Sequence, residues 1–189
     1  MDAVDICNDA LGMCGHDVEI TGLTDSSAEA VKCARFWPRA RRAVLSEPGW
    51  NFNKETSEAV EDESAAELPG WDYAYFRDAG ALVMAQVLDA AGERLDYTVR
   101  SGVIYTREQA SVIEFTRDEE DPERWPEGVV QAVTADLAYR LGKVLGRDSK
   151  VLSGLAQEKR EALAGAKRTE RTNAGAQVGN KNRYAAARV

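Results

Sequence analysis

The chain has 189 residues, 44% of them hydrophobic and 30% charged, with a formal net charge of −8, a composition typical of a soluble globular protein. The odd count of three cysteines argues against a disulfide framework, and no apolar run approaches the roughly 18 residues of a transmembrane helix. The N-terminal residues lack the basic segment of a signal peptide, so we expect a protein that is soluble and reduced inside the cell when it is made.

The first two elements are predicted to be helices. Residues 1–15 carry an apolar face at spacings of three and four, formed by Val4, Cys7, Leu11 and Cys14. We expect these cysteines to be small core residues, because free cysteine is among the most buried residue types, and we expect His16 to be exposed in the following loop. Ser26 and Glu29 predict a capping box at the start of a second helix that runs to about residue 46, with Pro38 kinking it. A short loop joins the two helices, so they are expected to form an antiparallel pair.

Residues 50–117 differ from these helices and predict a small antiparallel sheet. Ser101 and Gly102 form a turn between two alternating apolar segments, which indicates a β-hairpin. The expected strands cover residues 73–76, 81–88, 95–99, 103–106 and 111–116, although a helix would also fit residues 81–85. Glutamate and aspartate are frequent in residues 55–67, so this stretch is predicted to be a mobile loop.

Two further helices are predicted after the β insertion. Asp121 and Pro122 favour the first turn of a third helix, because aspartate caps it and proline gives up an N–H that has no partner there. Its apolar stripe is formed by Val130, Val133, Leu137, Leu141 and Val144. A fourth helix is expected to begin at Asp148 or Ser149 and to continue to about residue 171.

The predicted fold class is α+β and mainly α. It is a bundle of about four helices with a small antiparallel β insertion between the second and third helices and an extended C-terminal tail. We expect one domain over residues 1–171, with the helices in 1–48 and 121–171 and the insertion in 50–117. Residues 172–189 have few large apolar side chains and are predicted to be a flexible basic tail.

Charge is distributed unevenly along the chain. Residues 150–189 contain nine basic and three acidic residues, a balance of +6, so the remaining residues carry −14. A basic tail on an acidic body favours binding to an acidic protein surface or to nucleic acid. A solvated tail that only keeps the chain soluble fits this composition equally well.

The sequence lacks the phosphate-binding, dinucleotide-binding, zinc-peptidase and nucleophile-elbow motifs. Its single histidine cannot supply a pair of metal ligands. An acidic cluster over residues 118–123 could coordinate a divalent cation, but stabilisation of the positive end of the third helix explains it better. We therefore expect a protein that is not an enzyme and that has no cofactor or metal.

Several motifs follow one another in an order that resembles a known family. They are Trp37-Pro38-Arg39-Ala40-Arg41 in the second helix, Pro48-Gly49-Trp50-Asn51-Phe52 after it, and Gly70-Trp71-Asp72-Tyr73-Ala74-Tyr75 in the insertion. This order is similar to that of the head-to-tail adaptor proteins of tailed bacteriophages, including the tail tubular protein A type. The residues that carry the resemblance are Trp37, Pro38, Arg41, Pro48, Trp50, Phe52, Trp71, Tyr73 and Tyr75. From the residues alone, core packing explains these aromatic rings better than contact with a partner does.

The resemblance implies a structural virion protein. About twelve copies would form a closed ring under the portal vertex, join the head to the tail and continue the DNA channel. The implied partners are the portal protein and a downstream tail, nozzle or stopper protein, while genomic DNA passes without specific binding. The implied location is the head–tail junction of the virion, after synthesis in the host cytoplasm and without a membrane.

The basic tail is the predicted portal-binding segment, because a charged tail of this kind can become ordered on its partner. The residues expected to make this contact are Arg168, Arg171, Lys181, Arg183, Tyr184 and Arg188. An alternative function is that of a packaging-associated DNA-binding protein that uses the same tail. A further alternative is a small acidic enzyme with a metal ion at residues 118–121.

Overall fold

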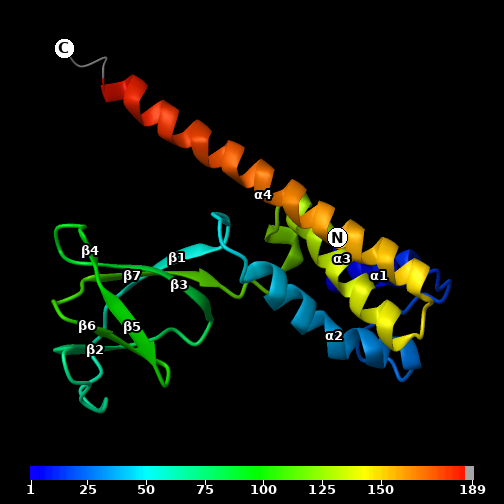
Figure 1. The fold of residues 1–189 in the computed structure, drawn as a ribbon, viewed down its shortest axis with the longest axis horizontal. Coiled ribbons are helices and arrows are strands. Elements are labelled where there is room, and N and C mark those ends of the chain that lie inside the picture. Colours follow the sequence, from blue (N-terminus) through cyan, green and yellow to red (C-terminus); the bar gives the residue numbers. More distant parts are fainter. Residues whose placement is uncertain (186–189) are drawn as a thin grey trace. The chain divides into compact units, whose positions relative to one another are not determined.

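The computed structural model describes residues 1–185, with side chains described through Thr172 (Figure 1). The chain divides into a helical unit, which comprises Met1–Phe52 and the chain from Glu119 onward, and a β unit, which comprises Asn53–Asp118. The four helices of the described chain are α1 (Ala3–Met13), α2 (Ala28–Leu45), α3 (Glu127–Val144) and α4 (Ser149–Ala185). The predicted fold class is confirmed, because antiparallel β-structure separates α2 from α3 in an otherwise helical chain.

Helix α1 begins at a double cap formed by two aspartates. The Asp2 carboxylate accepts hydrogen bonds from the backbone N–H groups of Val4 and Asp5, at 2.7 and 2.9 Å. The Asp5 carboxylate accepts one in return from the Asp2 N–H, at 2.9 Å. This capping box satisfies N–H groups that have no partner within the helix, so the predicted helix has a stable start. The helix buries Ile6, Cys7, Ala10 and Leu11.

Helix α2 begins one residue later than the sequence predicts. Ser27, not Ser26, is the N-cap residue, and its hydroxyl oxygen accepts a hydrogen bond from the Ala30 N–H at 3.2 Å. Pro38 lies inside the helix as expected, where it removes one backbone donor. The buried side chains of α2 include Cys33, Trp37, Ala40, Val44 and Leu45. One side of the helix therefore faces the core, and the other side is left to the surface.

Helix α3 is the centre of the helical unit. Helices α1, α2 and α4 all pack along it, whereas α1 and α2 contact each other over a shorter stretch than the predicted pairing implies. Every residue from Ala132 to Ala138 is buried, as expected for a helix that is covered on more than one side. The predicted apolar stripe is correct from Val130 to Leu141 and wrong at Val144, which is 46% exposed in the last turn.

The start of α3 also differs from the prediction. Asp121 and Pro122 begin a short 3₁₀ helix, Pro122–Arg124, and α3 itself begins at Glu127. Pro126 accounts for the break, because the residue before a proline is pushed out of the helical region. That residue, Trp125, has ψ 140° and is extended.

Two glycines of α3 allow α4 to come close. A Cβ atom on Gly128 would lie 3.1 Å from the Cα atom of Ala166, and one on Gly142 would lie 2.9 Å from Leu155 Cδ1. A side chain at either position would force a neighbouring group to move. The absence of these side chains thus sets the spacing between α3 and α4, whose contact is the most extensive in the helical unit.

The β unit contains two antiparallel sheets rather than the single sheet that the sequence predicts. Its strands are β1 (Lys54–Glu58), β2 (Tyr73–Phe76), β3 (Ala81–Leu88), β4 (Arg94–Leu95), β5 (Tyr97–Arg100), β6 (Val103–Thr106) and β7 (Val112–Arg117). One sheet has the strand order β1-β7-β3-β4 and the other β2-β6-β5. Both sheets contribute to one core of buried residues, which are Tyr75, Ala81, Val87, Ile104, Ala110, Ile113 and Phe115.

The predicted hairpin is confirmed, and the predicted acidic loop is wrong at its start. Strands β5 and β6 pair across a turn whose two residues both have positive φ, 50° at Ser101 and 83° at Gly102. Strand β1 occupies the beginning of the stretch that the sequence predicts to be a loop, and Lys54 pairs with Thr116 of β7. Its charged and polar residues carry no strand pattern of their own, because pairing with β7 rather than local preference makes this segment a strand.

Helix α4 continues past the predicted start of the tail. Its 37 residues end at Ala185, and Figure 1 shows its C-terminal half extending beyond the N-terminal end of α3. At about 1.5 Å per residue, the helix is about 55 Å long. The described backbone of α4 is helical through residue 185, and residues 186–189 lie outside the described chain.

Candidate interaction surfaces

A buried aspartate links α4 to α3. Asp136 of α3 is 1% exposed, and its two carboxylate oxygens form ion pairs with Arg140 of the same helix and with Lys159 of α4. A carboxylate buried without cations would be unfavourable by several kcal/mol. The pairing with Lys159 therefore makes this link specific for one alignment of the two helices.

Two further polar contacts hold the middle of α4 against the segment that follows α2. Lys167 Nζ lies 2.5 Å from Glu47 Oε2. The buried Glu170 carboxylate accepts a hydrogen bond from the Asn51 N–H at 3.1 Å. Helix α4 is thus anchored by polar contacts as far as Glu170.

The predicted portal-binding residues begin where this anchoring ends. Arg168 and Arg171 are exposed on α4, on either side of Glu170 in the sequence. Lys181, Arg183 and Tyr184 belong to the helical backbone of α4, but their side chains lie outside the described ones. Arg188 lies outside the described residues altogether. The structure thus brings Arg168 and Arg171 together on one exposed stretch and places three of the others further along the same helix.

The motif residues of α2 are core residues. The Trp37 ring is 6% exposed and stacks on that of Trp125, with centroids 5.8 Å apart and an interplanar angle of 20°. Arg41 is also buried, and its Nη2 atom donates to Glu120 Oε1 at 2.6 Å. Both contacts hold the segment that leads into α3 against α2.

Trp50 closes the corner after α2. Its ring is 1% exposed, and its Nε1 atom donates to the Val44 carbonyl at 2.7 Å. The half-buried Phe52 ring meets it edge-on, with centroids 6.2 Å apart. Pro48 is exposed just before this corner, and Gly49 has φ 105°, a conformation that favours glycine. The predicted packing role is therefore confirmed for Trp50.

The motif residues of the β unit are likewise engaged in packing. Tyr75 is fully buried, and its hydroxyl oxygen accepts a hydrogen bond from the Ala110 N–H at 2.8 Å. The rings of Tyr73 and Tyr75 stack at 6.5 Å, and the Arg107 guanidinium lies 5.2 Å from the centre of the Trp71 ring. Burial raises the pKa of Tyr75, so this hydroxyl group stays protonated well above neutral pH.

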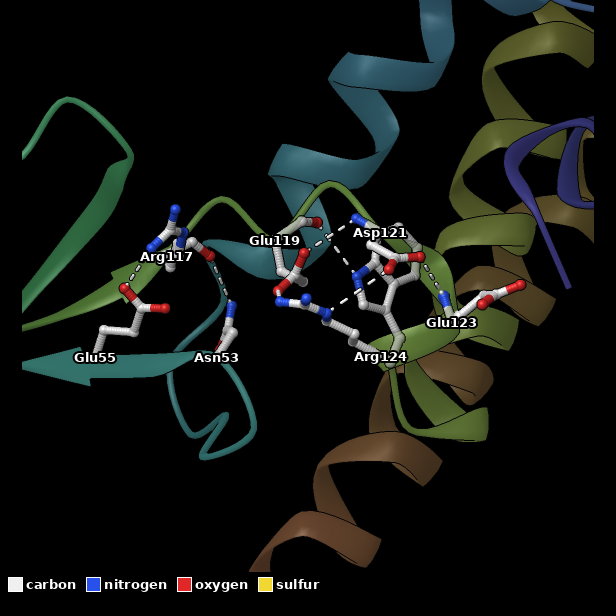
Figure 2. A network of polar contacts seen from close by, with 8 residues as sticks. Asn53, Glu55, Arg117, Glu119, Asp121, Glu123 and Arg124 are labelled. Carbon is white, nitrogen blue, oxygen red and sulfur yellow. Dashed lines mark hydrogen bonds and ion pairs between the residues drawn. The ribbon is translucent and has the colours of Figure 1, made fainter.

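The acidic segment before α3 is held by its own neighbours. Figure 2 shows Arg124 beside two carboxylates, with Nη1 3.4 Å from Glu119 Oε2 and Nε 3.6 Å from Asp121 Oδ2. Asp121 also accepts a hydrogen bond from the Glu123 N–H at 3.1 Å, as the cap of the 3₁₀ helix. These contacts favour the helix-start interpretation of the cluster over a cation site.

Figure 2 also shows how the β unit is closed where the chain enters and leaves it. Asn53 Nδ2 donates to the Arg117 carbonyl at 3.0 Å, and the Arg117 N–H donates to the Asn53 carbonyl at 2.8 Å. Arg117 Nη1 forms an ion pair with Glu55 Oε2 at 2.7 Å. The first residue of the β unit and its next-to-last residue are thus hydrogen-bonded neighbours.

The three cysteines and the single histidine are all buried or half-buried among other residues. All three cysteines are buried and free, which confirms the predicted core role of Cys7 and Cys14. A hydrogen bond with Cys33 together with burial raises the pKa of Cys7, and burial raises that of Cys14, so neither thiol is an activated nucleophile. The prediction for His16 is wrong: it is half-buried, and its Nε2 atom lies 3.2 Å from Glu29 Oε1, because the chain turns back on itself after α1.

A concave surface that the sequence does not predict lies between α1, α3 and α4. It is a groove of about 610 Å³. Its floor is apolar and includes Met13, Val130, Ala135 and Ala162, and its rim carries the carboxylates of Asp9, Glu19, Glu127 and Glu158. Lysine and arginine are absent from its lining within the described part of the chain. We call this surface the acidic groove. Its residues come from four separate segments, so no local pattern indicates it.

Helix α2 carries a basic surface on its exposed side. The guanidinium carbons of Arg35 and Arg39 lie 5.6 and 5.7 Å from the centre of the Phe36 ring. Both arginines are exposed, and Val31, one turn earlier, is 58% exposed. We call Val31, Arg35, Phe36 and Arg39 the basic ridge. Their spacing of three and four in the sequence places them on one side of a helix. The sequence alone does not indicate whether that side faces the core or the solvent.

Searches for metal sites, for membrane-spanning helices and for related proteins give no further indication of function. Among the side chains that the structure describes, no three His, Cys, Asp or Glu residues are grouped as metal ligands would be. No helix within the same range combines the length and the hydrophobicity needed to cross a bilayer. No protein-family model and no curated protein matches the sequence. What the chain does must therefore be inferred from its motifs, its fold and the two surfaces described above.

Proposed function

We propose that this chain is a head–tail adaptor of a tailed bacteriophage, a structural protein whose copies form a closed ring under the portal vertex. The ring, of about twelve copies, joins the head to the tail and continues the DNA channel. Its partners are the portal protein on one side and a downstream tail, nozzle or stopper protein on the other. It acts at the head–tail junction of the virion and is not an enzyme.

The order of the elements is the observation that carries this proposal. The family resemblance implies a helical bundle with a β-rich insertion, and in this chain the β unit lies between α2 and α3. The motif residues Trp37 and Trp50 are buried in the helical unit, and Tyr75 is buried in the β unit. The residues that carry the resemblance are thus residues on which the packing of both units depends, which supports a shared fold.

The charge of the chain fits the passage of DNA and the binding of a partner. The β unit contains 14 acidic and six basic residues, so phosphate groups would be repelled from it rather than retained. Exposed Arg168 and Arg171 lead into the part of α4 that continues beyond α3. We assign this end of α4 to the portal, because it is basic and follows Glu170, whose carboxylate holds the helix to the Asn51 N–H.

Mass photometry of the chain mixed with the portal protein of the same phage tests the proposal. The adaptor function predicts that each portal ring captures about twelve copies, since a closed ring must match the symmetry of its template. A chain that fails to associate with the portal at every salt concentration would contradict the function.

Removal of residues 172–189 tests the assignment of α4. The truncated chain is expected to keep its helical and β units but to bind the portal more weakly than the full chain. A matched control replaces exposed basic residues near the start of α4, as Lys150→Glu with Arg160→Glu, and should leave portal binding unchanged. Equal portal binding by truncated and full-length chains would show that this end of α4 is not the docking segment.

DNA binding is the second candidate function, because nine of the basic residues lie in residues 150–189 against three acidic ones. A packaging-associated DNA-binding protein would bind duplex DNA through this segment. Its affinity would fall steeply as salt is raised, since each phosphate contact releases counterions. Absence of duplex binding at low salt would remove this candidate.

A further inference from the structure

The acidic groove and the basic ridge are complementary in charge and in shape. The groove has an apolar floor and four carboxylates on its rim, and its described lining contains no lysine or arginine. The ridge presents one half-buried aromatic ring between two exposed guanidinium groups. A ring on the apolar floor and arginines on the carboxylates would satisfy both surfaces.

The two surfaces cannot meet within one chain. The described lining of the groove comes from α1, the loop after it, α3 and α4, and includes no residue of α2. The opposite side of α2 is fixed against the segment that leads into α3, where Trp37 stacks on Trp125 and Arg41 pairs with Glu120. The ridge therefore points away from the core of its own chain and is available to another molecule.

We propose that the basic ridge of one copy binds in the acidic groove of a second copy of this chain. Phe36 enters the apolar floor near Val130 and Ala162, while Arg35 and Arg39 pair with Glu127 and Glu158 on the rim. Ridge and groove are different surfaces, so the contact is heterologous, and each bound copy offers a free ridge or groove to the next one. Only one part of this inference rests on the proposed function, namely that the successive contacts close into a ring.

The expected partner is a second copy because each chain carries both halves of the contact on one helical unit. A separate basic peptide could enter the same groove, and so could the C-terminal end of α4 from another copy. For each of these occupants, a different set of variants should lose binding. The same experiment therefore distinguishes them from the basic ridge.

Sedimentation velocity of the full chain, over a concentration series at low salt, measures the self-association. We expect the wild-type chain to form dimers and larger species. The double variant Arg35→Glu with Arg39→Glu should lower the association constant on the order of 100-fold, because two attractive contacts become repulsive. Glu127→Arg with Glu158→Arg should have the same effect from the groove side. All four residues are exposed, so the far-ultraviolet circular dichroism of these variants should be unchanged.

The chain that carries all four substitutions is the decisive variant. Its ridge is acidic and its groove rim is basic, so self-association should return to within about tenfold of wild type. The matched control, Lys150→Glu with Arg160→Glu, changes the net charge as much as the ridge variant does and should associate like wild type. Both control residues are exposed on α4 and outside the groove lining.

Several outcomes would overturn the inference. A wild-type chain that stays monomeric at its highest soluble concentration would do so, as would a fourfold variant that fails to recover. Equal loss in the control would assign the effect to net charge. Loss after deletion of residues 172–189, with none in the ridge variant, would assign the groove to the C-terminal end of α4. Portal capture is measured separately. A chain that self-associates through the basic ridge and the acidic groove but does not bind the portal would contradict the proposed function without contradicting this contact.

Discussion

The helical unit and the β unit of this chain are built in opposite ways. The helical unit joins two distant parts of the sequence, Met1–Phe52 and the chain from Glu119 onward, whereas the β unit is one continuous segment, Asn53–Asp118. The helical unit must therefore bring α1 and α2 onto α3 across the whole insertion. The β unit closes locally, where Asn53 and Arg117 exchange hydrogen bonds. The long-range unit is thus held by specific contacts between distant residues, and the local unit is held by its own strand pairing.

The two units also differ in charge. The β unit has 14 acidic and six basic residues, while the helical unit has 18 of each. The net charge of −8 therefore belongs entirely to the β unit. In the helical unit, opposite charges are instead sorted onto separate surfaces, the acidic groove and the basic ridge. A neutral unit with acidic and basic residues on separate surfaces is suited to bind copies of itself, and a unit with a net charge of −8 is suited to repel nucleic acid.

Core truncations in each unit should have the largest effects and should separate the units. Trp50→Ala removes a ring that is 1% exposed in the helical unit, and Phe115→Ala removes one that is 2% exposed in the β unit. Each change should lower the free energy of unfolding of its own unit by about 3–5 kcal/mol. Hydrogen exchange, measured peptide by peptide, should show loss of protection in the altered unit only. Equal loss of protection in both units for either variant would mean that they unfold as one.

Loss of the buried carboxylate should have the next largest effect. Asp136→Asn removes the charge that Lys159 and Arg140 pair with, and should destabilise the helical unit by about 2–3 kcal/mol, between the values for exposed and buried ion pairs. Urea unfolding followed by circular dichroism measures this change. The control Glu161→Gln alters an exposed carboxylate of α4 and should change stability by less than about 0.5 kcal/mol. An unchanged midpoint for Asp136→Asn would show that the link to α4 contributes no net stability.

The close approach of α3 and α4 predicts opposite effects for two glycine substitutions. Gly128→Ala places a Cβ atom 3.1 Å from Ala166 Cα and should destabilise the helical unit by about 1–2 kcal/mol. Gly165→Ala, on α4, meets no atom within 4 Å and should stabilise the helix by about 0.5–1 kcal/mol. Thermal unfolding of both variants tests the pair. A stabilising Gly128→Ala would mean that the two helices can move apart without cost.

The smallest expected effect lies in the β unit and depends on pH. Tyr75→Phe leaves the Ala110 N–H without its acceptor and should cost about 1 kcal/mol at pH 7. Burial raises the pKa of Tyr75 above the value near 10 of an unfolded tyrosine, so the native state keeps this proton longer than the unfolded state does. Its contribution to stability is complete below about pH 10 and is lost as the pH rises further.

Urea unfolding of both proteins between pH 7 and pH 11 measures this contribution. Wild type and Tyr75→Phe should differ most at neutral pH and converge above about pH 10, because only wild type loses the contribution of a buried hydroxyl group. The other tyrosines are common to both proteins and cancel in the comparison. A stability difference that is independent of pH would show that Tyr75 ionises as it does in the unfolded chain.

Local patterns predicted most of the helical unit. The apolar spacing in α1, the proline within α2 and the stripe from Val130 to Leu141 are each properties of one short segment. The predicted starts of α2 and α3 were wrong because a neighbouring residue changes where each helix begins. Ser27 replaces Ser26 as the cap of α2, and Pro126 delays the start that Asp121 and Pro122 would otherwise give to α3.

The β unit was less predictable because strand pairing is not local. The Ser101-Gly102 hairpin could be predicted, since its turn residues and flanking strands are adjacent in the sequence. Strand β1 could not, because the pairing of Glu55 with Phe115 joins residues 60 positions apart. The same limit applies to the division of the strands into two sheets, which depends on which distant segments find each other.

The helices, the hairpin, the motif aromatics and the excess of acidic residues in the middle of the chain could be predicted from the amino-acid sequence, because each depends on neighbouring residues. Packing between distant segments makes α3 the common partner of α1, α2 and α4, and brings Asp136 to Lys159. It also brings four carboxylates from separate segments around one apolar groove, opposite in charge to the exposed side of α2. The physical reason is that a surface is formed by residues that meet in space, and their meeting is fixed by packing across the chain rather than by their order along it.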